Sequence, residues 1–297
     1  MKQSNWTAQN IPDQTGKIII ITGATSGLGK QATKVLAGKN ATIIMAVRNI
    51  KKAETVASEI KVEFPDAKLD IRQLDLGSLN SIKTFATDFS KAYDKLDILI
   101  NNAGVMACPY SKTEDGFEIQ MGTNHFGPFA LTGLLFDLLK KTPNSKIVST
   151  SSFAHLQGNI DFADINWETR DYHTTKAYAD SKIANLYFTY ELAKKCQDGH
   201  PLVTACHPGW TKTELDRYSG ITEFLGNIFA QKVEMGTLPT LRAAFDVDAK
   251  PGDFFGPEGW FGIRGYPIKV QSNKLSHSEE LVKKLWEVSQ QQTGVSY

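Results

Sequence analysis

Tyr178 and Lys182 are four positions apart in the segment AYADSKIA, residues 177–184. In a helix, residues with this spacing lie on one face, so the phenol and the ammonium would be neighbours. A free phenol has a pKa of about 10 and exchanges protons poorly at neutral pH. A nearby cation lowers that pKa, which would let Tyr178 exchange a proton with an alcohol or carbonyl oxygen. Because this spacing is also common on helix surfaces, it indicates acid–base chemistry only together with other groups.

Polar and small residues follow two apolar segments that are typical of buried strands. Ser151 and Ser152 come directly after residues 146–150, and the sequence NNAG at residues 101–104 follows the segment LDILI. Ligands bind at the carboxyl ends of the strands in an open α/β sheet. A serine hydroxyl there could polarise a substrate oxygen, and the small residues would let a cofactor lie across the sheet.

A glycine-rich turn, TGATSGLG at residues 22–29, follows the apolar segment KIIIIT at residues 17–22. Glycine lets the backbone approach a phosphate closely, and a helix that begins there offers free N–H groups and a positive dipole end. The spacing is GxxxGxG, which differs from the GxGxxG fingerprint and lacks the Gly-Lys-Ser/Thr ending of a nucleotide-triphosphate loop. The turn favours a pyrophosphate site, and a tight strand–helix connection without a ligand is the alternative.

The second apolar segment ends with Val47 and Arg48. Folds that bind NAD usually place an acidic residue at this point, on the ribose 2′-hydroxyl. Val47 has no such group, whereas Arg48 could make a forked contact with a 2′-phosphate. The pair favours NADP(H) over NAD(H), and a solvated loop cation is the alternative for Arg48.

The elements that must position these residues alternate from about residue 17 to residue 210. Apolar segments predict strands at 17–22, 41–47, 69–74, 96–100, 146–150 and 202–206. Helical spacing of apolar residues occurs at 28–36, 53–60 and 82–89. Such alternation predicts a parallel sheet covered by helices on both faces. The last third holds many Gly, Pro and aromatic residues, which predicts loops over 209–275 with a short strand near 268–270, and then a closing helix at 278–291.

The composition limits the classes of function. The chain has 297 residues, of which 33 are Lys or Arg and 32 are Asp or Glu, so the net charge is +1. This balance argues against a nucleic-acid or anionic-membrane partner held by bulk charge. Three cysteines without a CxxC pair argue against a disulfide framework and a structural zinc site, and the scattered histidines lack a metal-ligand spacing. We expect one domain over residues 1–297 and no metal.

The N-terminal segment is polar, and no apolar run approaches the roughly 18 residues that span a bilayer. We therefore expect a cytoplasmic protein without a signal peptide or a membrane span. A serine hydrolase would need a GxSxG elbow, which the sequence lacks. A catalytically idle regulatory or scaffold protein that binds a cofactor is the main rival to an enzyme, and consumption of NADPH with carbonyl compounds would separate the two.

In chain order, the motifs TGxxxGxG, NNAG, Asn124, Ser152, YxxxK and PG resemble those of the short-chain dehydrogenase/reductase family. The segments NHFGPF at 124–129, SSFAH at 151–155 and YADSKIAN at 178–185 are most similar to its retinol dehydrogenase and WW-domain oxidoreductase group. The resemblance covers nearly the whole chain. It implies a Rossmann-type, doubly wound α/β fold with a mostly parallel, seven-stranded sheet and helices on both faces.

The resemblance also implies roles for the matching residues. Tyr178 would be the acid–base, Lys182 would lower its pKa and hold the nicotinamide ribose, Ser152 rather than Ser151 would orient the substrate oxygen, and Asn124 would hold a water linked to Lys182. The cofactor-binding residues would be Gly23, Ser26, Gly27, Leu28 and Gly29 at the pyrophosphate, Arg48 at the 2′-phosphate, Asp75 and Leu76 at the adenine, Asn102, Ala103 and Gly104 at the adjoining ribose, and Pro208, Gly209, Thr211 and Thr213 at the nicotinamide.

The implied activity is that of an NADP-dependent oxidoreductase that acts on CH–OH groups. It would interconvert an alcohol and a carbonyl compound, an aldehyde or a ketone, and residues 17–208 would form its cofactor-binding and catalytic core. The substrate-side loops at 209–275 hold the apolar residues Trp210, Phe224, Leu225, Phe229 and Trp260. These favour a lipophilic substrate, and a place in the core is the alternative for the aromatic ones. The family commonly forms dimers or tetramers, so we expect a homo-oligomer. An apolar stripe that could serve as its interface, or could equally well face the sheet, comprises Leu131, Leu134, Leu135 and Leu138.

Overall fold

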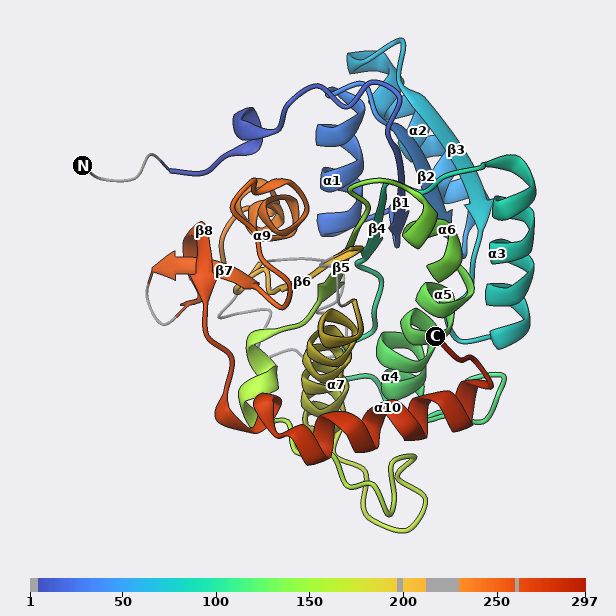
Figure 1. The fold of residues 1–297 in the computed structure, drawn as a ribbon, viewed down its shortest axis with the longest axis vertical. Helices are drawn as coiled ribbons and strands as arrows, with labels where there is room; N and C mark the ends of the chain where they lie inside the picture. The colour runs from blue at the N-terminus through green and yellow to red at the C-terminus, as the bar shows by residue number, and fades with distance from the viewer. Residues whose placement is uncertain (1–4, 197–199, 212–229, 260–261) are drawn as a thin grey trace.

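One eight-stranded sheet runs through the computed structural model, which describes residues 5–196, 200–211, 230–259 and 262–297 (Figure 1). The strands are β1 (Ile18–Thr22), β2 (Thr42–Val47), β3 (Lys68–Gln73), β4 (Ile98–Asn101), β5 (Lys146–Thr150), β6 (Leu202–Cys206), β7 (Phe254–Gly259) and β8 (Arg264–Val270). Their spatial order is β3-β2-β1-β4-β5-β6-β7-β8. Only β8 runs antiparallel to its neighbour. The strand order reverses between β1 and β4, and in such sheets this switch point is where ligands bind.

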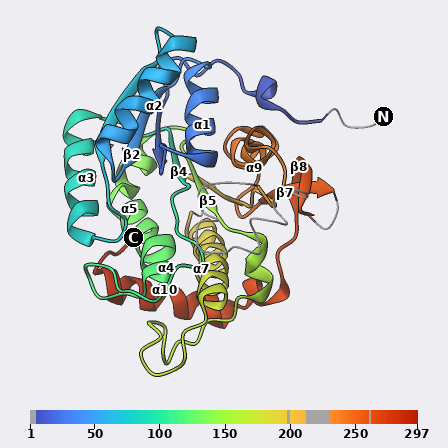
Figure 2. The same cartoon turned by 180° about the vertical axis from the view of Figure 1, so that it is seen from behind.

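Helices cover both faces of this sheet (Figures 1 and 2). One layer contains α1 (Gly27–Ala37), α2 (Ile50–Glu63) and α9 (Val233–Phe245), and the other contains α3 (Leu79–Ala92), α5 (Gly127–Leu134) and α7 (Thr174–Lys195). Along β1, Ile19 and Ile21 pack in the first layer, whereas Ile20 packs in the second. This alternation of fully buried side chains explains why the strand reads as one continuous apolar run.

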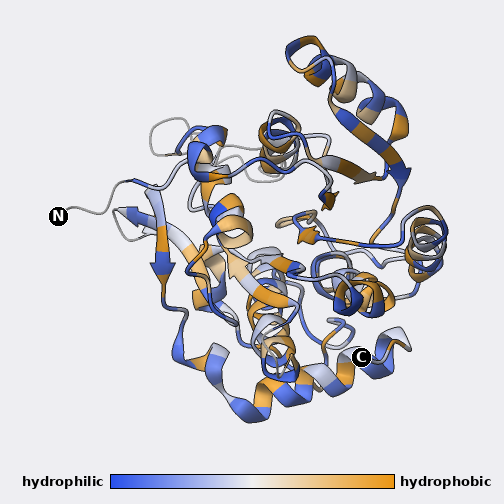
Figure 3. Cartoon of the chain, turned by 45° about the horizontal axis from the view of Figure 1, so that its top comes forward, coloured by the Kyte–Doolittle hydropathy of each residue, from blue (hydrophilic) through white to orange (hydrophobic). Residues whose placement is uncertain are grey.

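The C-terminal helix α10 (Glu279–Thr293) crosses the outer side of the second layer. Hydrophobic and hydrophilic residues alternate along it, as Figure 3 shows, and Trp286 packs into the core formed with α5 and α7. The final residue, Tyr297, lies among the same aromatic rings and donates a hydrogen bond to the Phe129 carbonyl at 2.7 Å. The C-terminus is therefore part of the folded core.

The apolar stripe that was expected as an oligomer interface lies largely inside the fold. Leu131 and Leu135 are fully buried and pack with sheet residues such as Ile147, whereas Leu134 is 40% exposed. The stripe thus faces mainly inward, and the homo-oligomer stays a prediction without it. Among the described residues, no helix has both the length and the apolar character needed to cross a lipid bilayer.

The predicted fold class is confirmed, with eight strands instead of seven. The additional strand is β7, in the segment 209–275 that was expected to form loops because it holds many Gly, Pro and aromatic residues, Gly256 and Pro257 among them. It is a strand because Phe254 and Phe255 are buried beside β6 and because β8 pairs with its other edge. The division of the chain at residues 208 and 209 stays a prediction.

Candidate active site

A cavity of about 470 Å³ lies at the carboxyl ends of the strands, across the switch point between β1 and β4. Its volume is in the range of small-molecule sites. Several segments line the cavity: the glycine turn, the end of β2, the segment after β4, the end of β5 and α7. Those predicted from the sequence and found in the lining are Gly23, Ser26, Gly27, Leu28, Gly29, Arg48, Asp75, Leu76, Asn102, Ala103, Gly104, Tyr178, Lys182 and Pro208.

Two glycines at the junction of β1 and α1, Gly23 and Gly29, have no room for larger side chains. A Cβ atom at Gly29 would lie 2.2 Å from the Gly23 carbonyl oxygen and 2.6 Å from Asn102 Nδ2, and Gly23 has a φ of +70°. Asn102 Nδ2 donates to the Thr22 carbonyl at 2.8 Å, which ties the end of β1 to the segment after β4. Because the turn opens directly into α1, backbone N–H groups and the positive helix end face the cavity, as a pyrophosphate requires.

Two cations lie at the end of the cavity beside β2. Arg48 was predicted there, and Lys52, in the first turn of α2, was missed. Asn49 caps that helix, since its side chain accepts a hydrogen bond from the Lys52 backbone N–H at 2.9 Å. Its position could have indicated Lys52, because it follows Arg48 by four residues, and residues one helical turn apart lie on the same side. A dianionic phosphate would therefore meet two cations here.

Tyr178 and Lys182 lie together in the wall formed by α7. The Lys182 ammonium is 5.5 Å from the centre of the Tyr178 ring, and its Nζ donates to the Thr150 carbonyl at 3.3 Å. Lys182 is only 5% exposed, and this burial lowers its pKa to about 8. At neutral pH the lysine is thus still a cation, placed where it can stabilise negative charge on a phenol oxygen.

The adjacent serines have different environments. Ser151 is 1% exposed and its hydroxyl donates to the Lys182 carbonyl at 2.7 Å, so it holds α7 against β5. Ser152 is partly exposed, and its Oγ accepts a hydrogen bond from the Ala154 N–H at 3.2 Å. Among described residues the cavity lining includes Ser151 and not Ser152. Ser152 directly follows the lining residue Ser151 in the chain and is the residue before the short helix η3 (Phe153–Gln157).

Asn124 lies in a π-helical turn, Gly122–Phe126, and is buried. Its side-chain nitrogen donates to the Val105 carbonyl and to Ser181 Oγ, both at 2.9 Å, and its oxygen accepts from the Val105 N–H at 2.8 Å. The side chain therefore connects the segment after β4 to α7, next to Lys182 in sequence. Its predicted link to Lys182 through a water stays a prediction.

The residues expected at the nicotinamide end are only partly brought together. Pro208 lines the cavity, and Gly209 and Thr211 follow it without appearing in the described part of the lining. Thr211 Oγ1 donates back to the Pro208 carbonyl at 2.9 Å, which closes this turn. Thr213 and the apolar candidates Phe224, Leu225, Phe229 and Trp260 lie outside the described residues.

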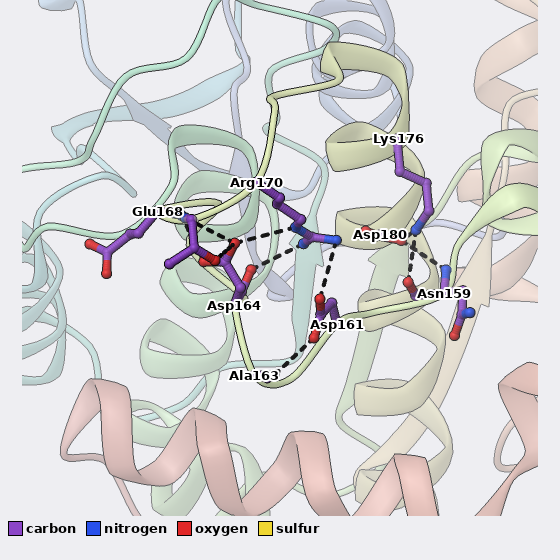
Figure 4. Close-up of polar contacts among 9 residues, drawn as sticks. Asn159, Asp161, Ala163, Asp164, Glu168, Arg170, Lys176 and Asp180 are labelled. Carbon is purple, nitrogen blue, oxygen red and sulfur yellow. Dashed lines mark hydrogen bonds and ion pairs between the residues drawn. The ribbon is translucent and has the colours of Figure 1, made fainter.

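The long connection from η3 to α7 is held by its own charged residues (Figure 4). The Arg170 guanidinium lies 3.5 Å from the Asp164 carboxylate and 3.6 Å from the centre of the Trp167 ring. Asp180, on α7, accepts a hydrogen bond from the Asn159 N–H at 2.8 Å and pairs with Lys176. These contacts fix the loop that separates Ser152 from Tyr178. Across the described ranges, no group of three or more His, Cys, Asp or Glu side chains is arranged to hold a metal ion.

Comparison with known proteins decides the family. The family model described as short chain dehydrogenase matches residues 17–223. The chain belongs to this family. Human retinol dehydrogenase 13 is 40% identical to it over 291 residues, which covers 94% of this chain and 85% of the human protein. Mouse retinol dehydrogenase 12 is 40% identical over 279 residues, which covers 92% of this chain and 88% of the relative.

Solved structures agree with this assignment to the short-chain dehydrogenase family. A crystal structure of a protein from Mycobacterium paratuberculosis has a TM-score of 0.83 and 38% identity, and the match covers 99% of both chains. A short chain dehydrogenase from Shigella flexneri, complexed with NADP, has a TM-score of 0.66 and 27% identity, with 82% of this chain and 97% of that one covered. The chain is thus an oxidoreductase of the kind that acts on CH–OH groups with a nicotinamide cofactor.

Proposed function

We propose that this short-chain dehydrogenase interconverts a carbonyl compound and an alcohol with NADP(H), and that Tyr178 is its acid–base. The observation that carries the proposal is the arrangement of the cavity. Tyr178 and Lys182 form one wall, and the glycine turn that suits a pyrophosphate forms another. When bound, the nicotinamide supplies or accepts the hydride at the substrate carbon.

The protein's own residues would handle the proton. In the reductive direction the Tyr178 hydroxyl gives its proton to the substrate oxygen as the carbon accepts the hydride, and in the oxidative direction the phenolate takes it back. Lys182 favours the phenolate by its charge. Ser152 would donate a hydrogen bond to the same oxygen and so fix its position.

The preference for NADP(H) rests on the cations at the end of β2. Arg48 and Lys52 both line the cavity there, while Val47 ends the strand without an acidic group for a ribose hydroxyl. The relative complexed with NADP supports the same choice. The retinol dehydrogenase names of the curated relatives favour a lipophilic alcohol or aldehyde as substrate. The cytoplasmic location and the homo-oligomer stay predictions.

The experiment is a survey of NADPH consumption with aldehydes and ketones, and of NADP reduction with alcohols, by the parent and by Tyr178→Phe. The variant keeps the ring and loses only the hydroxyl, so turnover should fall about 100- to 10,000-fold while NADP(H) still binds. Tyr110→Phe is the matched control, because Tyr110 is exposed, its hydroxyl donates to the Asn166 carbonyl at 3.2 Å, and neither residue belongs to the described cavity lining.

Two results would contradict the proposal. If Tyr178→Phe kept turnover within about threefold of the parent, another group would have to be the acid. If the parent bound NADPH but turned over no member of the survey, the rival function of a cofactor-binding scaffold would be favoured.

A further inference from the structure

His155 touches the backbone of the serine that the proposed function places on the substrate oxygen. Its ring nitrogen Nδ1 lies 2.7 Å from the Ser152 carbonyl oxygen, and its backbone N–H donates to the same oxygen at 3.0 Å. Both contacts close the first turn of η3, in which Ser152 is the residue before the helix. The direction of the Ser152 side chain depends on this backbone, because χ1 rotamers are set relative to it.

The chemistry of this contact determines the form of the imidazole. A carbonyl oxygen only accepts hydrogen bonds, so His155 Nδ1 must carry a proton, and in a neutral ring Nε2 is then bare. His155 is 3% exposed, and burial lowers its pKa, so the ring is neutral at neutral pH. Within the part of the chain that the structure describes, the buried Nε2 has no hydrogen-bond partner.

An unpaired buried nitrogen destabilises the fold, and an apolar side chain at this position would avoid that penalty. The hydrogen bond from Nδ1 to Ser152 is the contact that only a side chain with a donor can make here. The imidazole therefore suits a position where holding the Ser152 carbonyl matters more than ideal packing.

The His155 ring itself packs against β7, and the His155 backbone is tied to the segment after β8. Phe254 of β7 packs edge-on against His155, with 5.5 Å between ring centres, and its centre is 5.2 Å from that of the His207 ring. Asn273 Nδ2 donates to the His155 carbonyl at 3.1 Å. Because His207 directly precedes the cavity-lining Pro208, one packed group connects the serine to the turn at the expected nicotinamide end.

We propose that His155 is a positioning residue for the reaction, whose Nδ1–H holds the Ser152 carbonyl and thereby aims the Ser152 hydroxyl at the substrate oxygen. The proposal rests on the proposed function, since it needs Ser152 to act on that oxygen. His155 does not touch the substrate itself.

A pair of variants of equal shape isolates the hydrogen bond. In His155→Asn the amide nitrogen is bonded to Cγ, as Nδ1 is in histidine, so the donor to Ser152 is kept. In His155→Leu a methyl group takes that place, and both variants lose the same ring. We expect His155→Leu to lower kcat about 10- to 100-fold, as small misplacements of catalytic groups do, with little change in the Kd for NADP(H). His155→Asn should recover kcat to within about threefold of the parent.

The same two changes made in a Ser152→Ala background separate positioning from general damage. Without a hydroxyl to aim, His155→Leu and His155→Asn should have equal kcat, because coupled residues are not additive. If His155→Leu lowered kcat as much in this background as in the parent, its role would be merely structural and the proposal would be overturned. If Tyr178→Phe were active, the proposed function would fail instead.

A measurement that needs no substrate tests the contact directly. Long-range ¹H–¹⁵N spectra of the labelled protein should show His155 as the neutral Nδ1–H tautomer at neutral pH. An Nε2–H tautomer or a charged ring would contradict the contact on which the proposal depends, whatever the enzyme turns over.

Discussion

The wall of the cavity that suits the cofactor consists largely of backbone and small residues, whereas the wall formed by α7 depends on polar side chains from α7 and from the segments packed against it. The first wall is built from glycines whose Cβ atoms would collide with neighbouring backbone, as at Gly29. The second depends on Lys182, Ser151 and Asn124, each with a partner far away in the sequence. The glycines of the first wall have a spacing that can be recognised in the sequence. The residues of the second wall can be recognised in the sequence only by their types.

The two walls also differ in how much they destabilise the folded state. Glycine in a strained turn is a small and local penalty. A buried ammonium loses its hydration, which lowers its pKa and destabilises the folded state as long as it stays charged. The comparison can be tested by changing one wall at a time and asking whether affinity for the cofactor or stability of the fold responds.

The largest effect is expected from Gly29→Ala on the cofactor wall. The new methyl group would lie 2.2 Å from the Gly23 carbonyl oxygen, so the turn must move. We expect the Kd for NADP(H), measured by fluorescence titration, to rise about 100-fold or more, with some loss of stability. Gly16→Ala is the control, because Gly16 has a φ of +78° and no heavy atom within 4 Å of the added Cβ. It should lose stability and keep cofactor affinity; equal affinities for the two variants would show that the turn is not the pyrophosphate site.

A smaller effect is expected from Arg48→Ala, which changes the same wall without moving the backbone. Loss of a charge-assisted contact to a 2′-phosphate should weaken NADP(H) binding about 30-fold and leave NAD(H) binding nearly unchanged. Lys51→Ala removes a neighbouring exposed cation that does not belong to the described lining, so it controls for net charge. An equal loss for both cofactors in Arg48→Ala would place the arginine elsewhere than on the phosphate.

The contrast between the walls also explains how far the sequence alone could reach. The apolar run of β1, the turn after it and Arg48 are local features. The run forms the expected strand, and glycines of the turn and Arg48 line the cavity, while their roles toward a cofactor stay predictions. Strand β7 was missed because its Gly256 and Pro257 are typical of turns, and only its pairing with β6 and β8 makes it a strand.

The wall formed by α7 could be predicted only in part from local features. Spacing could place Tyr178 and Lys182 on one helix face, but not the burial of the lysine or its contact with Thr150. Nothing local indicates that Ser151 is engaged with the Lys182 carbonyl while Ser152 starts η3. These are tertiary contacts, and each depends on how α7 packs against β5.

The smallest effect concerns the wall formed by α7 and appears as a pH dependence of stability. Burial lowers the pKa of Lys182 from 10.5 to about 8 in the folded chain. Between these two values the unfolded chain binds more protons than the folded one, so this group makes the fold more stable as the pH rises. Below about pH 8 it is charged in both states and its penalty is complete.

Comparison with Lys182→Met isolates this contribution, because all other titrating groups are common to both proteins. From pH 7 to pH 9, the unfolding free energy of the parent should rise relative to that of the variant by about 1 kcal/mol. Denaturant titrations of both proteins at the two pH values would measure the change. A difference that stayed constant would mean that the lysine keeps an ordinary pKa, and one that moved toward the variant would mean that folding raises its pKa. In either case the α7 wall would lack the cation with a lowered pKa that distinguishes it from the cofactor wall.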